Sequence, residues 1–226
     1  MQAKRLSFFM VLSVFMFSLL FVGCGSDDLK YFSQKVSDQR MNYFQGETTD
    51  YFVSFSSGVR ESPYVLDGKT GDKVDFGIIL IKPKNSSQIE NITYNVFINN
   101  EEFVGEFEKS PFDETYAGDI NKKVLDDDII VVKINNGSGE QEATLSSVSK
   151  DFKVDSQKAL KIAIEELGEN KPKLKEQNFE IYIKLFQDIT NKIKDKYWIV
   201  TFLCEDSQSF NVLINPTTGE CEQKKL

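Results

Sequence analysis

The three cysteines and 35 acidic residues are the first side chains to consider for chemistry, and the sequence of 226 residues contains no histidine. Without histidine, Ser-His-Asp and Cys-His catalytic arrangements and the usual zinc and copper sites are excluded. Neither of the phosphate-binding patterns G-x-x-x-x-G-K-[ST] and G-x-G-x-x-G occurs. We therefore expect no catalytic residue, no metal site and no cofactor, and a protein that is not an enzyme.

Cys24 stands at a border in the sequence. Two basic residues, Lys4 and Arg5, precede an apolar run over residues 6–22 that only three serines interrupt. A basic segment followed by an apolar one is typical of a secretory signal peptide. The run is at the lower edge of the roughly 17–25 residues that a membrane-spanning helix needs, so a plain transmembrane anchor is the alternative.

The residues at this border, Phe21-Val22-Gly23-Cys24, resemble the lipobox of bacterial lipoproteins, although Phe21 stands where leucine is usual. In that family the cysteine thiol is alkylated with diacylglycerol and the leader is cut off before the cysteine. The resemblance implies that Cys24 is the lipid-attachment residue and that the protein lies on the extracytoplasmic face of the cell membrane. Each buried CH₂ of such a lipid contributes about 0.8 kcal/mol to the anchoring.

The charge of the chain limits its partners. Removal of the leader takes Lys4 and Arg5 away, which leaves 25 of the 27 basic residues against 35 acidic ones. Such a surface repels phosphate backbones and anionic headgroups. We expect no nucleic acid partner, and contact with the membrane through the lipid anchor.

The acidic residues form two local groups. Asp67, Asp72 and Asp75 lie in or beside "DGKTGDKVD", and residues 126–128 are three consecutive aspartates. Either group could hold calcium together with backbone carbonyls, but neither has the spacing of a calcium-binding loop. We interpret them as a solvated turn and the entry to a strand. Because the two carboxylates of a glycoside hydrolase can lie far apart in sequence, an anchored carboxylate-dependent hydrolase that acts on cell-envelope material stays the alternative function.

Two cysteines, Cys204 and Cys221, remain beyond the lipobox, and an exported pair invites a disulfide. The expected turns place Cys204 opposite Ser209 and Cys221 near Leu213. The two thiols would then lie about four residues apart, on the order of 13 Å, whereas a disulfide needs Cα atoms within about 7 Å. This spacing argues against a bridge, but the turn positions leave the pairing open, and we expect Cys204 to be a packed thiol.

Aromatic residues cluster in "MNYFQGETTDYF". At an exposed edge they would suit the binding of sugars or peptides, but in strands such residues more often belong to the core. We expect the core role for these four: Tyr43, Phe44, Tyr51 and Phe52.

The elements that would position these residues fall into two regions. Residues 42–150 read as a β-rich domain with strands in "DYFVSFSS" and "VDFGIILIK". A hairpin is predicted in "NITYNVFINNEEFVGEFEK", with its turn at Asn99 and Asn100, and a second in "DDIIVVKINNGSGEQEATLSSVS". Several short strands with polar turns indicate a β-sandwich or a partly open barrel.

Residues 151–226 indicate a smaller α+β domain. The segment "DSQKALKIAIEELG" predicts a helix capped by Asp155 or Ser156 and ended by Gly168. Three antiparallel strands are expected after it, and in "YWIVTFLC" alternate residues are apolar on both faces. One helix against a three-stranded sheet would bury apolar surface economically. The predicted fold class is α+β, with the β-sandwich or barrel followed by this unit.

This helix, followed by "YWIVTF" and "SFNVLINPTTGE", resembles the PepSY-like domain over residues 154–219, with Asn215 where the family usually has aspartate. The family occurs in exported and membrane-anchored proteins, and peptidase inhibition or chaperoning is the activity that the resemblance implies. We therefore expect a signal peptide over 1–23, the lipidated cysteine and a tether over 24–41, the β-rich domain over 42–150 and the PepSY-like domain over 151–226. The expected function is that of a lipid-anchored, non-enzymatic binding protein whose partner is a peptidase or another cell-envelope component.

Overall fold

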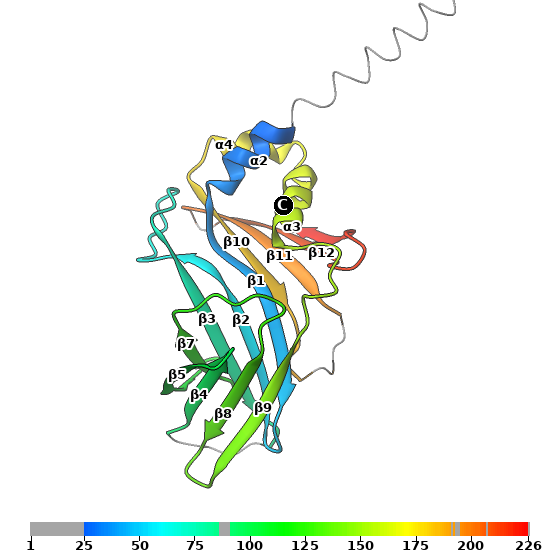
Figure 1. Cartoon of the computed structure of the whole chain (residues 1–226). Helices are drawn as coiled ribbons and strands as arrows, with labels where there is room; N and C mark the ends of the chain where they lie inside the picture. The colour runs from blue at the N-terminus through cyan, green and yellow to red at the C-terminus, as the bar shows by residue number, and fades with distance from the viewer. Residues whose placement is uncertain (1–24, 86–90, 191, 193–194, 207, 226) are drawn as a thin grey trace, which may run out of the picture. The chain divides into compact units, whose positions relative to one another are not determined.

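The structure is a computed structural model that describes residues 25–85, 91–190, 192, 195–206 and 208–225 (Figure 1). The chain divides into two compact units, residues 1–34 and 35–226. In the first unit the helix α2 spans Gly25–Ser33. No helix among the described residues is long and apolar enough to cross a membrane.

The second unit is mostly β: a nearly closed nine-stranded antiparallel barrel, short helices, and a small antiparallel sheet that follows a helix. This confirms the predicted partly open barrel followed by a helix and an antiparallel sheet. The barrel strands are β1 (Val36–Glu47), β2 (Tyr51–Glu61), β3 (Lys73–Pro83), β4 (Thr93–Ile98), β5 (Glu101–Glu106), β6 (Glu108–Lys109), β7 (Tyr116–Ile120), β8 (Ile130–Asn135) and β9 (Glu140–Ser147).

The barrel is closed by backbone pairing everywhere except beside β5. One wall runs β1-β2-β3-β7-β6, and the other returns to β1 through β5-β4-β8-β9. The hydroxyl of Tyr94 on β4 bridges the gap, because it donates to the carbonyl oxygen of Asp119 on β7 at 2.8 Å. A Cβ atom on Gly118 would lie 2.3 Å from the Tyr94 ring, and one on Gly105 would lie 2.4 Å from its hydroxyl. Glycines therefore line the ring on both sides.

Apolar side chains from alternate positions fill the barrel, as strand periodicity requires. Tyr51, Val53 and Phe55 of β2 point inward and are fully buried. In β3 the inward Ile79 and Ile81 are buried, whereas the intervening residues that face outward are only half-buried. The continuous apolar run of this strand suggests burial on both faces, but only the inward face is fully buried along the run.

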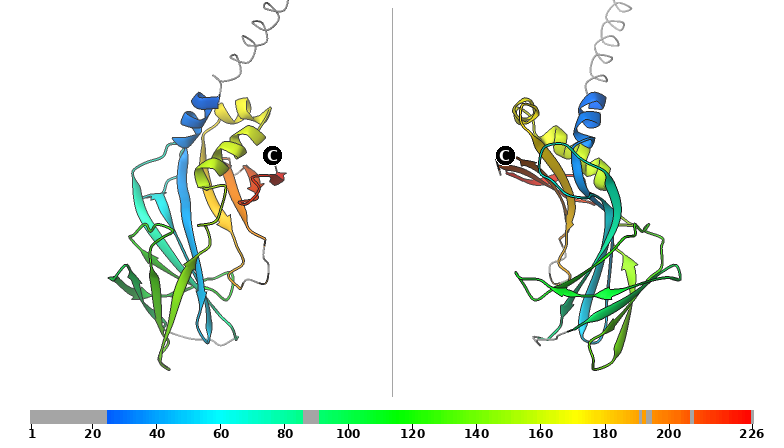
Figure 2. Two further views of the ribbon diagram at one scale, coloured as in Figure 1. Left: turned by 45° about the vertical axis from the view of Figure 1, so that its right-hand side comes forward. Right: turned by 90° about the vertical axis from the view of Figure 1, so that its left-hand side faces the viewer.

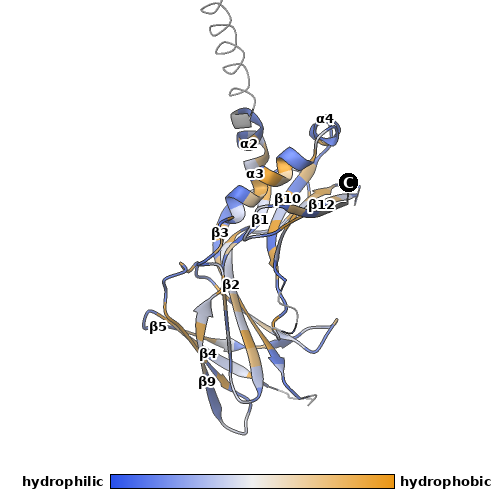
Figure 3. Cartoon of the chain, turned by 90° about the vertical axis from the view of Figure 1, so that its right-hand side faces the viewer, coloured by the Kyte–Doolittle hydropathy of each residue, from blue (hydrophilic) through white to orange (hydrophobic). Residues whose placement is uncertain are grey.

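The C-terminal sheet follows the helix α3 (Ser156–Glu166) and the short helix α4 (Asn170–Lys175). Its strands are β10 (Phe179–Phe186), β11 (Tyr197–Cys204), β12 (Ser209–Ile214) and β13 (Cys221–Lys225). Asp155 caps α3 by accepting from the Lys158 backbone N–H at 2.7 Å, as predicted. The buried indole of Trp198 donates to the Val154 carbonyl at 2.7 Å and fixes the start of α3 against β11. Figure 3 shows the apolar stripe of α3 together with apolar strands of the sheet.

Strand β1 belongs to both parts of this unit. It pairs antiparallel with β2 and, over its first residues, parallel with β10. Further along, β9 takes the place of β10 beside β1. The two views of Figure 2 show the barrel and the C-terminal strands diverging on either side of β1. The boundary expected near residue 150, between the β-rich domain and the α+β domain, lies inside the second compact unit, residues 35–226.

Several predicted elements are present and others differ. Asn99 and Asn100 form the turn of the β4–β5 hairpin with φ of 48° and 73°, as a tight hairpin turn requires. Where a tether was expected over 24–41, the structure has α2 and the first half of β1. A fourth strand, β13, extends the predicted three-stranded sheet, and the short helix α4 lies between α3 and the first of its strands.

Candidate functional site

The C-terminal sheet has two unequal faces. On β11 the side chains of Trp198, Val200 and Phe202 are fully buried on the side of α3. The alternate side chains of the same strand, including Ile199 and Leu203, are half-buried. We call the side opposite α3 the open face, and its apolar members on paired positions are Tyr182, Phe186, Ile199, Leu203 and Leu213.

The open face continues onto the outer wall of the barrel, because β10 and β1 are neighbours in one sheet (Figure 1). Asp38 on β1 lies beside Tyr182 on β10 and also beside Arg60 on β2. Arg40 lies beside Gly58, which pairs in turn with Phe76 on β3. These side chains share a face because paired residues of adjacent strands point to the same side.

We call the polar and aromatic group at this crossing the sheet-junction patch; its members are Asp38, Arg40, Arg60, Phe76, Tyr182 and Lys184. The guanidinium carbons of Arg40 and Arg60 lie 5.9 and 4.8 Å from the centre of the Phe76 ring. The ring is fully buried although it points to the outside of the barrel. Both arginines therefore cover it in a cation–π arrangement.

Asp38 lies between two cations in the patch. Its Oδ1 atom is 3.8 Å from the Nε of Arg40, and its Oδ2 atom is 3.5 Å from the Nζ of Lys184. Both distances exceed a hydrogen-bond length. The Oδ1 of Asp38 and the Nε of Arg40 are buried atoms without a hydrogen-bond partner among the described residues.

Backbone irregularities shape the patch. The register of β1 shifts between Arg40 and Asn42 against β2, and again between Val36 and Asp38 against β10. A Cβ atom on Gly58 would lie 1.9 Å from the carbonyl oxygen of Gln39, so the chains approach too closely for any side chain there. Bulges of this kind redirect side chains and often lie beside functional sites.

Two tyrosines extend the patch toward the loop between β2 and β3. The rings of Tyr64 and Tyr182 meet edge to face with centroids 6.0 Å apart, and the ammonium of Lys184 lies 5.3 Å from the Tyr182 ring centre. Burial, followed by the hydrogen bond that it donates to Tyr64, raises the pKa of Tyr182 far above its usual value. The phenol of Tyr182 therefore stays protonated and can donate.

Two buried carboxylates fix the β2–β3 loop. Glu180 accepts from the Ser37 hydroxyl and, through its other oxygen, from the Asp67 backbone N–H at 3.1 Å. Glu61 accepts from the Gly71 backbone N–H at 2.7 Å. Both oxygens of Glu180 have partners, whereas the Oε2 of Glu61 is buried without a hydrogen-bond partner among the described residues. The bonds to backbone N–H groups explain the loop conformation.

The acidic groups that the sequence suggested for calcium do not converge. Asp67 accepts from the backbone of Lys69, while Asp72 and Asp75 are exposed. In the run 126–128, the first aspartate accepts from two serine hydroxyls, the second pairs with Lys150 and the third binds the Asn99 amide. Over the described part of the chain, no group of three or more metal-binding side chains forms.

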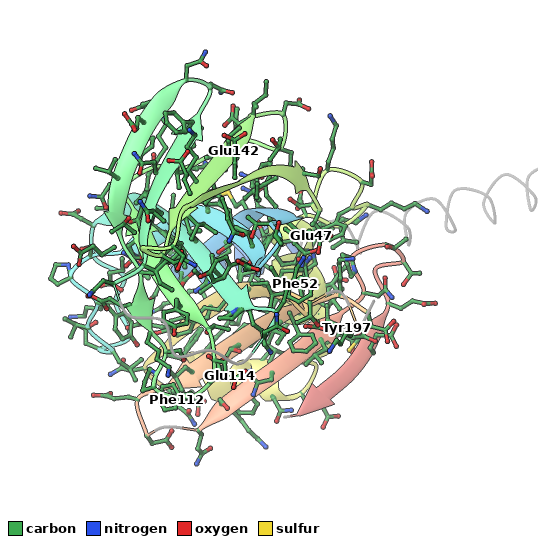
Figure 4. All side chains as sticks on the ribbon, turned by 90° about the horizontal axis from the view of Figure 1, so that it is seen from below. Glu47, Phe52, Phe112, Glu114, Glu142 and Tyr197 are labelled. Carbon is green, nitrogen blue, oxygen red and sulfur yellow. The ribbon has the colours of Figure 1, made fainter. Side chains whose placement is uncertain are left out.

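The remaining sequence candidates lie as follows. Of the four clustered aromatics, Tyr43, Phe44 and Tyr51 are buried, as predicted, and Phe52 is half-buried. Phe52 is labelled in Figure 4 beside Glu47, with which it is paired. Cys24 lies outside the described residues.

The two later cysteines are not joined in a disulfide. Cys204 pairs with Phe179, whereas Cys221 pairs with Ile214, which itself lies opposite Trp198 at the other end of β11. The thiols are therefore further apart than expected. Burial raises the pKa of the Cys204 thiol, in agreement with the predicted packed thiol.

Two hollows occur near these elements. One of about 440 Å³ is lined by Gln177, Asn178, Cys204, Glu205 and Asp206. The other, of about 300 Å³, is lined by residues of the β1–β2 hairpin and of the loop after β10: Gln45, Gly46, Glu47, Phe52, Ile189 and Thr190. Neither hollow is lined by a lysine or an arginine of the described part of the chain, whereas the sheet-junction patch holds three cations beside aromatic rings.

Comparisons of the chain with protein-family models, with curated proteins and with solved structures give no match. The PepSY-like resemblance thus stays a prediction.

Sequence reasoning missed the patch because its members come from four strands whose pairing is not evident in the sequence. One signal was present in the composition. The chain has only three arginines, and the two that follow the leader, Arg40 and Arg60, are the two that cover Phe76.

Proposed function

We propose that the protein is a lipid-anchored, non-enzymatic binding protein of the extracytoplasmic face of the cell membrane, and that its open face binds a polypeptide. The observation that carries the proposal is the alternation on β11, where one set of apolar side chains is buried under α3 and the other is half-buried. Partly exposed apolar surface of this kind is typical of interaction sites.

The chemistry of the open face favours a polypeptide over a glycan. Its aliphatic side chains Ile199, Leu203 and Leu213 offer apolar contact. The polar pair between them is already engaged, because the Thr201 hydroxyl donates to the Oδ1 of Asn211 at 2.7 Å. The partner is a peptidase or another cell-envelope protein, a choice supported by the PepSY-like resemblance of residues 154–219. Lipidation at Cys24, supported by the lipobox resemblance, holds the protein near such partners.

A hydrolase that uses two carboxylates is supported less well. The buried carboxylates Glu61 and Glu180 already accept backbone N–H groups of the β2–β3 loop. Asp127 and Lys150 form an ion pair at 2.6 Å, and the hydrogen bond from this ammonium lowers the pKa of the carboxyl group. A general acid would need the opposite shift.

Substitution of Ile199 by threonine tests the proposal. Ile199→Thr keeps a β-branched side chain in the strand but removes apolar surface, so we expect capture of a polypeptide from native membranes by the full chain to fall by about fivefold, from about 1 kcal/mol of lost burial. The matched control is Val131→Thr, since Val131 is also half-buried and points outward, but from β8. Mass spectrometry would quantify and identify the captured protein.

Equal recovery with the wild type and both variants would contradict binding through the open face. Recovery of glycans without a polypeptide would contradict the class of partner.

A further inference from the structure

We propose that the sheet-junction patch binds a carboxylate of the polypeptide partner, an aspartate or glutamate side chain or the C-terminus. The inference rests on the proposed function and adds to it the chemical class of the group that is recognised. Arginine is scarce in this chain and is concentrated at the patch. The chain has eight times as many lysines as arginines, yet both arginines after the leader lie in this patch.

Arginine differs from lysine in the geometry with which it binds a carboxylate. Its planar guanidinium stacks on aromatic rings and presents a rigid fork of N–H donors that matches the two oxygens of a carboxylate. Arg40 and Arg60 both stack against the buried ring of Phe76, which limits where their donors can point.

The donors in the patch are poorly used by the protein itself. The Nε of Arg40 is buried without a hydrogen-bond partner among the described residues. Arg60 contacts the carboxylate of Asp119, but the Nη2–Oδ2 distance of 3.7 Å is too long for a hydrogen bond. By contrast, Lys133, which also lies over an aromatic ring, contacts Glu140 at 3.0 Å. The Nε of Arg40 lies 3.8 Å from the buried Oδ1 of Asp38, which likewise has no hydrogen-bond partner in the described part of the chain. The donors that an incoming oxyanion can reach are therefore those of the partly exposed Arg60 and Lys184.

The charge balance in the patch also opposes an anion less than the rest of the acidic chain does. Three cations, Arg40, Arg60 and Lys184, face three carboxylates, Asp38, Asp119 and the buried Glu180 beside Tyr182. The patch is therefore close to neutral on a chain whose formal charge is −8. Asp38 holds the cations in place and leaves their outer donors available.

The position of the patch next to the open face indicates a carboxylate within a polypeptide. On β10, Lys184 and the 46% exposed Phe186 point to the same side, two residues apart, which is about 7 Å along a strand. A partner segment with an acidic residue close to apolar ones would contact both. A lipid phosphate or a free phosphate would use only the charged part.

Arginine side-chain NMR tests this inference directly, because the full chain gives only three Nε–Hε signals. The probe is the tripeptide Ac-Phe-Glu-Leu-NH₂, added to the full chain in neutral detergent up to about 10 mM, and the control probe is Ac-Phe-Gln-Leu-NH₂. We expect the glutamate peptide to shift the signals of Arg40 and Arg60 in a saturable way. We expect the signal of Arg5 to stay in place. The affinity of the glutamine peptide should be lower than that of the glutamate peptide by a factor of about ten or more.

Two variants separate recognition from general electrostatics. Arg60→Lys keeps the charge but loses the fork, and we expect about tenfold weaker binding of the glutamate peptide. Lys133→Gln, which removes a cation over a ring elsewhere, should leave binding unchanged. Thermal unfolding by circular dichroism would establish that both variants are folded.

The proposal is overturned if the signals do not respond to the glutamate peptide, if the glutamine peptide acts equally, or if only inorganic phosphate or phosphatidylglycerol vesicles shift them. These outcomes leave the proposed function standing when Ile199→Thr still reduces capture of the polypeptide. If Ile199→Thr has no effect on capture while the glutamate peptide binds, the result contradicts polypeptide binding by the open face and supports carboxylate binding by the sheet-junction patch.

Discussion

At the scale of single residues, the chain places scarce side chains where their chemistry is specific. Its single tryptophan, Trp198, donates from a buried position and ties the start of α3 to β11. Both arginines beyond the leader cover one phenylalanine ring. Side chains of this kind cost the most to replace, because their partners would be left without a hydrogen bond or without cover.

The anchoring residue can be tested by itself. Cys24→Ala removes the thiol to which the lipid would be attached, so we expect a product without label after growth in radioactive palmitate. Wild-type protein should carry the label, and Cys221→Ala, which changes a different cysteine, should carry it too. Equal labelling of Cys24→Ala and wild type would contradict lipidation at this residue.

At the scale of the elements, the side chain of Tyr94 bridges the gap beside β5. Gly118 leaves room for the ring of Tyr94, whose hydroxyl bridges to β7. A methyl group at this position would overlap the ring, since its Cβ would lie 2.3 Å from a ring carbon. The barrel therefore depends on a small residue at a fixed position.

We predict that Gly118→Ala lowers the free energy of unfolding by about 1–3 kcal/mol, the usual cost of overpacking. Urea unfolding followed by circular dichroism would measure it. In a chain that also carries Tyr94→Leu, the added cost of Gly118→Ala should shrink because the ring is gone. An unchanged midpoint for Gly118→Ala alone would show that the ring does not fill this gap.

Elements whose local signals agree could be predicted from the sequence. The helix α3 has a capping aspartate, apolar spacing and a terminal glycine, and the β4–β5 hairpin has two asparagines suited to its turn. Strand β1 was missed over its first half, because "VSDQRM" has no alternation of apolar and polar residues. Two of its polar residues, Asp38 and Arg40, belong to the sheet-junction patch, and Gln39 on the other face donates to Ser156 of α3. Polar residues on both faces therefore remove the alternation that identifies a strand.

The candidate site could not be predicted for a related reason. Arg40 and Lys184 are brought together by the parallel pairing of β1 with β10, across most of the chain. Periodicity describes one strand at a time and says nothing about which strands become neighbours. The sequence "YWIVTFLC" does show apolar residues on both faces of the strand. The half-buried set of these residues, which includes Ile199 and Leu203, forms part of the open face.

At the scale of the whole second unit, one strand connects the barrel and the C-terminal sheet. Because β1 pairs with β2 on one side and with β10 on the other, the outer barrel wall and the open face form one continuous surface. The apolar part of this surface lies on β10–β12, and the sheet-junction patch lies on β1–β3 and on β10. A partner segment that crosses β10 would contact both parts.

Site-specific photo-crosslinking in living cells tests most directly that this surface binds a polypeptide. Benzoylphenylalanine would replace Phe186 on the open face and, as the matched control, Phe97, which points outward from β4. The account predicts a discrete adduct with another protein from position 186 and none from position 97, and weakening of the adduct by Arg60→Lys. An adduct of equal yield from both positions, or none from position 186, would contradict it.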